Sequence, residues 1–288
     1  MKHHIIGKFT ALARGLGAAA LACGIVAASA SAAAQAAPAV PTIKPGVMTI
    51  GIDLTWPPYD HIVDGKPAGF DVDFMEKVAQ QLGLKPVFED TRFANLVLGL
   101  MGHRFDVVAS ALYITAERAK QIDYVPYLKT GGSLITLQDS SYRPQKPEEL
   151  CGKRVASLKG AAWVPVLDQL SRSHCAAQGK GAIQVQEFAS SPLAAQALLA
   201  RSADVQFDDA AVSQMMVRQS GGRLAVTSTE ILYPVVIGLG VPKGNPAMLQ
   251  ALSGALDAMK ADGSYAALLE AYSVEEPSAA EVAAAYGK

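Results

Sequence analysis

A short segment that ends in Arg118 has the residue types of an anion site. Ser110 closes an apolar run that predicts a strand, and Arg118 lies within one turn of a helix start expected at Thr115. An Arg side chain binds a carboxylate through two parallel N–H donors, and backbone N–H groups at a helix start add more donors. Alternatively, Arg118 pairs with a nearby Asp or Glu, as most Arg residues do. The segment alone leaves both interpretations open.

Two adjacent acids, Asp208 and Asp209, follow another expected strand at 204–207. At least one carboxylate there should lie where ligands of α/β folds bind. It could accept hydrogen bonds from an ammonium group, or it could cap the following helix. A cation on one segment and anions on another suit a zwitterion better than a simple anion or cation.

A rigid aromatic loop follows the first expected strand. Pro57 and Pro58 stiffen this loop, and Trp56 has no periodic role in a helix or a strand. Trp56 could form a flat platform for a ligand, or it could plug the hydrophobic core. For Tyr59 we favour the second interpretation.

The elements that position these residues alternate between strands and helices, which is typical of an α/β fold. The expected strands are 47–52, 85–89, 105–110, 154–158, 183–188, 204–207 and 235–241. Asp71 is expected to cap the first helix, and Ser191 with Pro192 to begin a helix that runs to about Arg201. An extended stretch at 129–137 joins two α/β units of about a hundred residues. Ligands of such folds often bind between two lobes.

Composition bounds the class of protein. The 288 residues include 25 Lys and Arg against 26 Asp and Glu, a balance that argues against nucleic-acid binding. Three basic residues precede an uncharged, Ala-rich stretch at 15–43, and small residues lead up to Pro38. We interpret residues 1–37 as a cleaved signal peptide, which leaves a net charge of −4. An uncleaved membrane anchor and lipidation at Cys23 are the alternatives.

Export changes the meaning of the cysteines. Cys151 and Cys175 remain after cleavage and are expected to form a disulfide in an oxidising compartment, the alternative being two buried thiols. We expect no metal site, because His61, His103 and His174 are scattered and lack partners at ligand spacing.

Five motifs together resemble a known family. They are Asp53-Leu-Thr-Trp-Pro-Pro-Tyr59, Gly69-Phe-Asp-Val-Asp73, Phe105-Asp-Val-Val-Ala-Ser-Ala-Leu-Tyr-Ile-Thr-Ala-Glu-Arg118, Val125-Pro-Tyr127 and Ala261-Asp-Gly-Ser-Tyr265. In this order and at these spacings, the chain from about 44 to 272 is similar to the family 3 extracytoplasmic solute-binding proteins of polar amino acid ABC transporters.

The resemblance implies a ligand site. Arg118 matches the residue that holds the ligand α-carboxylate, and Asp209 matches the acid that takes the α-ammonium group. Trp56 would stack on the ligand side chain and Phe93 would form a second apolar wall. Asp53 could reach the end of a basic side chain. The implied ligand-binding residues are Asp53, Trp56, Phe93, Ser110, Ala111, Tyr113, Arg118, Ala161 and Asp209.

The resemblance also implies the architecture and the partners. The fold would be an α/β, type II periplasmic binding protein fold, with a mixed sheet flanked by helices in each lobe and two hinge strands. Lobe 1 would comprise residues 44–131 and 236–288, and lobe 2 residues 132–235. A monomer in the periplasm would bind a free polar or basic amino acid and close on it. It would then dock on a membrane permease that works with a cytoplasmic ATPase, and no cofactor is expected.

One segment departs from the family pattern. Gly160-Ala161-Ala162-Trp163 stands where the family commonly has Gly-Thr-Thr or Gly-Thr-Ser. A hydroxyl that would contact the ligand carboxylate is therefore missing, and Trp163 beside it can reshape the pocket.

Two other functions fit the same scaffold. An enzyme similar to cyclohexadienyl dehydratase would need a general acid, for which Asp208 or Glu187 could serve. A sensor would instead deliver the liganded protein to a signalling receptor. We favour a receptor without catalytic activity.

Overall fold

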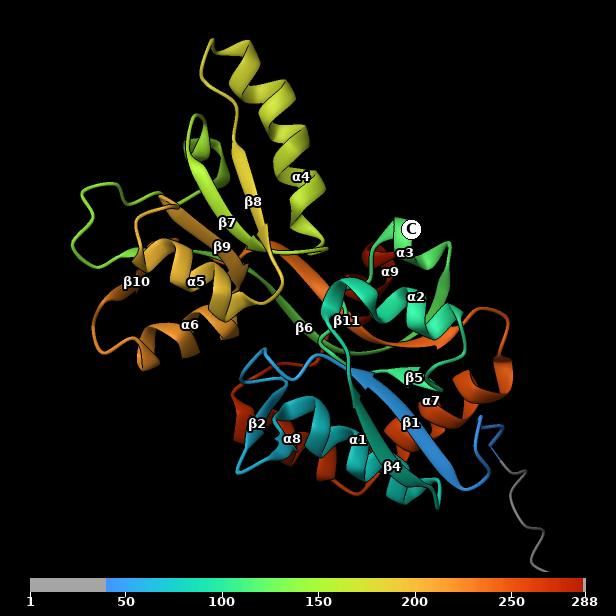
Figure 1. Cartoon of the computed structure of the whole chain (residues 1–288). Coiled ribbons are helices and arrows are strands. Elements are labelled where there is room, and N and C mark those ends of the chain that lie inside the picture. Colours follow the sequence, from blue (N-terminus) through green and yellow to red (C-terminus); the bar gives the residue numbers. More distant parts are fainter. Residues whose placement is uncertain (1–39, 287–288) are drawn as a thin grey trace, which may run out of the picture. The chain divides into compact units, whose positions relative to one another are not determined.

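The computed structural model describes residues 40–286 of the chain. The predicted signal peptide and Cys23 lie outside these residues. Among the described residues, most strands join one nine-stranded sheet with the order β4-β1-β5-β11-β6-β9-β7-β8, in which β10 pairs with β6 (Figure 1). Its strands are β1 (Val47–Ile52), β4 (Lys85–Asp90), β5 (Val107–Val108), β6 (Ile122–Leu137), β7 (Arg154–Leu158), β8 (Gln184–Phe188), β9 (Val205–Asp209), β10 (Leu224–Val226) and β11 (Leu232–Pro242).

The two ends of this sheet repeat one arrangement. In the first lobe β1 lies between β4 and β5, and in the second lobe β7 lies between β8 and β9, with all four pairings parallel. Each central strand is thus the first of its unit along the chain. The repeat agrees with the two α/β units expected from the alternating sequence pattern.

Two long strands join the lobes. β6 pairs antiparallel with β11 over most of its first half, and from Gly132 onward it pairs with β9. The expected extended stretch at 129–137 is the second half of this 16-residue strand. The fold is therefore two-lobed, with β6 and β11 as the connecting strands.

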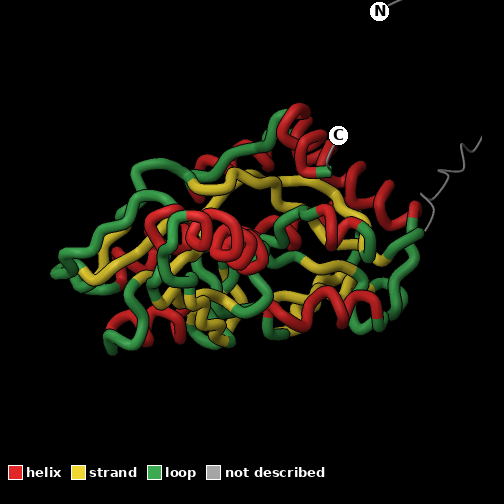
Figure 2. Tube along the Cα trace, turned by 90° about the horizontal axis from the view of Figure 1, so that it is seen from above, coloured by secondary structure: helices red, strands yellow, loops and turns green. Residues whose placement is uncertain are grey.

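Helices lie on both sides of the strands (Figure 2). They are α1 (Phe70–Gln81), α2 (Leu96–Met101), α3 (Ala116–Ala119), α4 (Trp163–Leu170), α5 (Ser191–Leu199), α6 (Ala210–Gln219), α7 (Pro246–Ala261), α8 (Ser264–Tyr272) and α9 (Ala279–Ala285). α1 buries Phe74 and Val78, members of its predicted apolar face, and Phe74 stacks on Tyr127 of β6 with ring centroids 4.9 Å apart. No helix in residues 40–286 is long and apolar enough to cross a membrane.

Local sequence signals predicted some helix and strand boundaries wrongly. Asp71 does not cap α1: the helix begins at Phe70 after Gly69, and the Asp71 side chain is fully buried. Ser190, rather than Ser191, is the N-cap of α5. β5 is shorter than predicted because Ala109 and Ser110 already belong to the loop that follows it. The hairpin of β2 (His61–Val63) and β3 (Lys66–Ala68), together with β10 and α9, was not predicted.

The predicted disulfide between Cys151 and Cys175 is present. It joins the end of a 3₁₀ turn (Pro147–Leu150) to a π-helical stretch (Ser171–Cys175) that continues α4. Cys175 is fully buried. The bridge ties the end of α4 to the 3₁₀ turn that precedes β7 within the second lobe.

Candidate functional site

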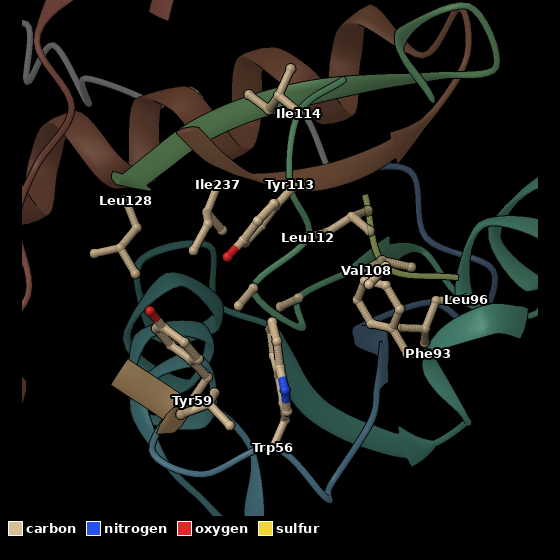
Figure 3. Packing of buried hydrophobic residues seen from close by; sticks show 14 of the residues in the cluster. Trp56, Tyr59, Phe93, Leu96, Val108, Leu112, Tyr113, Ile114, Leu128 and Ile237 are labelled. Atoms are coloured by element: carbon tan, nitrogen blue, oxygen red, sulfur yellow. The ribbon is translucent and has the colours of Figure 1, made fainter. Parts of the chain in front are cut away.

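The candidate site lies where the two lobes touch beside the connecting strands. Hydrogen bonds join the lobes there: Trp56 with Ser191 and Asp208, Tyr113 and Thr130 with Asp209, and Arg118 with the carbonyl of Gly160. Figure 3 shows Tyr113 reaching toward the rings of Trp56 and Tyr59 from the opposite side of the cluster. Most of the residues predicted for the site are therefore brought together by the fold.

Arg118 is a cation that has no carboxylate partner among residues 40–286. It lies in α3, whose first turn is capped by the Thr115 hydroxyl. Its guanidinium donates to the backbone carbonyls of Tyr113 and Gly160, at 2.9 Å each, and sits 5.4 Å from the centre of the Phe93 ring. None of the ion pairs found in residues 40–286 involves Arg118. Burial lowers the pKa of Arg118, which marks the cost of holding this charge away from water.

Asp209 is a fully buried acid with four hydrogen bonds. It ends β9 and caps α6, and its Oδ1 accepts from the backbone N–H groups of Ala211 at 2.8 Å and Val212 at 3.3 Å. Its Oδ2 accepts from the Tyr113 hydroxyl at 2.6 Å and the Thr130 hydroxyl at 2.8 Å. Burial raises the pKa of Asp209, and these four donors oppose the rise by stabilising the ionised form. Asp209 therefore has the helix-capping role that the sequence offered as an alternative, and it also faces the site.

The aromatic wall of the site is built by the first lobe. Trp56 lies 5.6 Å from Tyr59 and 5.9 Å from Phe93, measured between ring centroids. The Trp56 indole N–H donates across the lobe contact to Ser191 at 2.8 Å and Asp208 at 3.1 Å. Trp56 and Phe93 therefore belong to one cluster, and the polar edge of Trp56 is committed to the second lobe. Tyr59 is fully buried, in agreement with its predicted role in the core.

The Asp53 carboxylate is bound by residues of its own lobe. Its carboxylate pairs with Arg92 at 2.9 Å and accepts from the Thr55 hydroxyl and the Phe93 backbone N–H at 2.7 Å each. Burial nevertheless raises the pKa of Asp53. With these partners the carboxylate holds the loop that carries Phe93, and reaching a basic ligand would require Arg92 to leave.

Ser110 and Ala111 are held by a buried pair of acids. Ser110 donates to Asp60 at 2.8 Å and accepts from the Asp53 backbone N–H. Ala111 adopts a left-handed φ of 39°, which is uncommon for a residue with a side chain, and donates its N–H to Asp71 at 2.6 Å. The acids thus fix the backbone that leads to Tyr113.

Trp163, which follows the two alanines of the departing segment, packs against Tyr113. It begins α4 and is buried, and its indole N–H donates to Ser157 at 2.7 Å. Its ring meets Tyr113 edge-on at 5.7 Å and lies 5.3 Å from Phe207. Ala161 is buried beside it. The departure noted in the sequence is therefore a packed aromatic contact inside the site.

The structure adds three residues to the predicted set: Thr130, Ser191 and Asp208. Burial raises the pKa of Asp208 to about 6, although the Ser191 and Gln206 side chains and the Asp209 N–H favour its charged form. The sequence drew attention to Asp208 as a neighbour of Asp209 and as a candidate general acid of the alternative enzyme, but not as a ligand-binding residue. Thr130 carried no local signal, since its place beside Asp209 depends on the pairing of β6 with β9. Ser191 was noted only at a helix start, and its contact with Trp56 depends on how the two lobes meet.

The side chains of the candidate site contact one another directly. A cavity of about 740 Å³ lies next to them and is lined by Tyr59, Thr130, the start of α6, part of β11 and the C-terminal segment. Its lining does not include Trp56, Arg118 or Asp209. Trp56 and Asp209 are buried, whereas Arg118 is partly exposed. In the described residues, no group of three or more His, Cys, Asp or Glu residues is placed to hold a metal ion.

A two-lobed α/β fold with a charged and aromatic site between its lobes defines a class of ligand-binding proteins. The chain belongs to the bacterial extracellular solute-binding proteins, family 3, whose model matches residues 48–275. This membership bears out the resemblance drawn from the five motifs.

Three similar proteins are named for the binding of amino acids. The L-cystine-binding protein TcyJ of Escherichia coli K12 is 28% identical over 227 residues, which cover 78% of this chain and 82% of TcyJ. A structure of an ancestral arginine-binding protein bound to glutamine has a TM-score of 0.73 and 27% identity, covering 80% of this chain and 98% of that one. The ancestral amino acid-binding protein AncCDT-1, a precursor of cyclohexadienyl dehydratase, has a TM-score of 0.68 and 25% identity, covering 79% of this chain and 95% of that one. These relatives are binding proteins rather than enzymes.

Proposed function

We propose that this protein is the substrate-binding receptor of an amino acid ABC importer and has no catalytic activity. The observation that carries the proposal is the partly buried guanidinium of Arg118, which bonds to two backbone carbonyls but to no carboxylate in the described part of the chain. A partly buried Arg without a counter-ion is costly, and a ligand carboxylate would supply the missing charge. The binding of amino acids by similar proteins supports the same ligand class.

The proposed mechanism is closure of two lobes about β6 and β11. We assign residues 44–131 and 236–288 to lobe 1 and residues 132–235 to lobe 2, since β6 begins to pair with β9 at Gly132. A ligand on Arg118 would contact lobe 1 directly. Because Arg118 also donates to the Gly160 carbonyl of lobe 2, the ligand would thereby favour the closed form. The closed form would dock on a membrane permease that is driven by a cytoplasmic ATPase.

The compartment and the assembly state complete the proposal. Residues 1–37 would be removed as a signal peptide, and the mature monomer would work in the periplasm. The basic start and the uncharged Ala-rich stretch of the sequence support export, and the disulfide suits an oxidising compartment.

Replacement of Arg118 tests the proposed site. A calorimetric screen of the purified mature protein against L-cystine, L-arginine, L-glutamine and the other amino acids should identify a ligand. Arg118→Ala should then weaken its binding by about 2–5 kcal/mol, because the carboxylate loses its charged donors. Arg143→Ala, which removes an exposed Arg of the second lobe, is the matched control and should bind as wild type does. Equal affinity of Arg118→Ala and wild type would show that the site is assigned to the wrong residues.

The alternative enzyme can be tested directly. Asp208 and Glu187 were its candidate acids, but Asp208 is bonded to Trp56 and Gln206, and Glu187 accepts from the Gly160 N–H. Incubation with prephenate or arogenate should give no product detectable by absorbance, and product formation would contradict the receptor function.

A further inference from the structure

The cavity of about 740 Å³ beside the connecting strands, which we call the hinge cavity, is separate from the contacts of Arg118. Its walls are the start of α6 in the second lobe, parts of the C-terminal segment 273–285 in the first lobe, and residues 234–236 of β11 between them. Neither Arg118 nor Trp56 belongs to its lining. Because two lobes move least beside the strands about which they turn, this cavity should change less on opening than the site of Arg118 does.

The size and the lining of the hinge cavity suit a small organic molecule. Small-molecule sites commonly enclose about 300–1,000 Å³ and are lined mainly by apolar side chains with a few polar groups. Ile231 is 52% exposed, so apolar surface of the lining also faces solvent. Further apolar lining comes from Val235, Val274, Ala284 and Ala285. An occupant should therefore have an apolar body.

The charged side chains of the lining give the hinge cavity a negative balance. Lys129 Nζ lies 2.9 Å from Glu275 and 3.5 Å from Glu281, so two acids share one cation. The Ser278 backbone N–H donates to Glu281 and lowers the pKa of this acid, which therefore stays ionised at neutral pH. One Lys against two Glu leaves a net charge of −1 on the lining.

A further carboxylate lies behind one wall of the hinge cavity. Thr130 of the lining donates to the fully buried Asp209 at 2.8 Å. Burial raises the pKa of the neighbouring Tyr59 well above its usual value, and Asp209 raises it further, so Tyr59 stays neutral. A positive group in the cavity would be attracted by these acids, whereas a negative group would have to displace a glutamate from Lys129.

We propose that the hinge cavity is a second binding site that takes an amphipathic organic cation. Its ammonium group would lie near Glu275 and Glu281, and its apolar body would pack on β11 and the end of α9. This inference goes beyond the receptor function and does not depend on it, because the residues involved are not those proposed to bind the amino acid.

Three naphthalene probes with different polar groups test the charge preference. They are 1-naphthylmethylammonium, 1-naphthylmethanol and 1-naphthylacetate, titrated against the mature protein with the NMR signals of the probe as readout. Probes of this size should bind with dissociation constants of about 1 mM. The ammonium should bind about threefold or more tightly than the alcohol, as an exposed charge pair allows. An ammonium that binds no more tightly than the alcohol would overturn the proposal.

The carboxylate probe is measured in Arg118→Ala, because in wild type it can also bind at Arg118. There it should bind more weakly than the alcohol. If it binds more tightly than the ammonium in this variant, Lys129 recruits anions and the proposal is wrong.

Glu281→Gln tests the role of the acids. Gln can still accept the Ser278 N–H that Glu281 accepts at the start of α9, so the helix cap is kept. The variant should weaken ammonium binding by about threefold and leave alcohol binding unchanged. Glu76→Gln, which removes an exposed acid of α1 outside the lining, is the matched control and should bind both probes as wild type does. Equal ammonium affinity in the two variants would contradict the proposal.

Ala284→Trp tests the location of the site, because it places a bulky ring in the lining of the hinge cavity. It should weaken both the ammonium and the alcohol by about fivefold or more, since the apolar body loses its space. Ala283→Trp, at the adjacent exposed position of α9 outside the lining, is the control and should bind as wild type does. Arg118→Ala should also bind the ammonium as wild type does. Ammonium binding that is lost in Arg118→Ala but kept in Ala284→Trp would place the probe at Arg118 and overturn the proposal.

Discussion

At the scale of single residues, a pair of buried acids explains how the site loop is held in an uncommon conformation. Asp60 and Asp71 are fully buried, and between them they accept hydrogen bonds from Ser110, the Ala111 N–H and Tyr127. Two carboxylates in one apolar region cannot both ionise cheaply. Burial raises the pKa of Asp71 to about 6, and burial together with Asp71 raises the pKa of Asp60 well above its usual value.

The titration of this pair predicts how stability depends on pH. Both acids have a higher pKa in the folded chain than in the unfolded chain, where it is about 3.9. The folded chain therefore binds more protons, and the stability that they contribute is full below about pH 4 and is lost as pH rises through about 6 and above. Asp60→Asn should reduce this loss, because the amide imitates the protonated acid and Oδ1 of Asp60 has no hydrogen-bond partner in residues 40–286.

Urea unfolding at pH 5 and pH 8 measures the effect. Asp60→Asn should be more stable than wild type at pH 8, and the difference should shrink at pH 5. The titrations of His61 and Asp208 cancel in this difference because both residues are unchanged. Asp64→Asn removes an exposed acid and should follow wild type at both values. Parallel curves for Asp60→Asn and wild type would contradict the assignment.

At the scale of elements, the second lobe depends on a covalent link. The disulfide closes a loop of 24 residues that contains β7 and α4, and α4 begins with Trp163 of the site. Restricting a loop of this length in the unfolded chain stabilises the fold by about 3 kcal/mol. The link therefore also bears on how firmly Trp163 is held against Tyr113.

Removal of the disulfide should destabilise the chain by about that amount. The double variant Cys151→Ala with Cys175→Ala should unfold at lower urea concentration than wild type, and dithiothreitol should affect only wild type. Each single variant serves as a control, since either one removes the link completely. An unchanged midpoint in the double variant would show that the link does not stabilise the lobe.

Contacts between distant elements limit what the sequence can predict. The ends of β1 and β7 follow from local apolar patterns, and so does the α/β class. The predicted end of β9 at residue 207 is wrong, because the strand continues to Asp209 and includes both acids. Thr130 meets Asp209 because Gly132 pairs with Asp209 across β6 and β9, a register that no local pattern encodes. Asp53 looked available to a ligand only because its partner Arg92 comes from a distant loop. The packing of Trp163 on Tyr113 likewise depends on how the two lobes meet.

At the scale of the whole molecule, direct bonds between the lobes bear on whether the protein can close without a ligand. The indole N–H of Trp56 is shared by Ser191 and Asp208 of the second lobe, and a ligand takes no part in either bond. At Gly160, a Cβ atom would come within 3.3 Å of Ala94 Cα, so the backbones of the two lobes are also close there. We therefore expect the unliganded protein to populate the closed form.

Trp56→Phe tests that expectation, because Phe keeps an aromatic wall but has no N–H to donate. Loss of a hydrogen bond worth about 1 kcal/mol should shift the ratio of open to closed forms about fivefold toward open. Small-angle X-ray scattering of the unliganded variant should then give a larger radius of gyration than wild type, and a saturating ligand should reduce the difference. Ser191→Ala removes the nearer of the two acceptors, at 2.8 Å, and should produce a smaller change in the same direction, because Asp208 at 3.1 Å still accepts. The double variant should add little to Trp56→Phe, since Trp56→Phe already removes the donor. Identical scattering of wild type and both single variants would mean that these bonds do not hold the lobes together, and closure would then depend on the ligand alone.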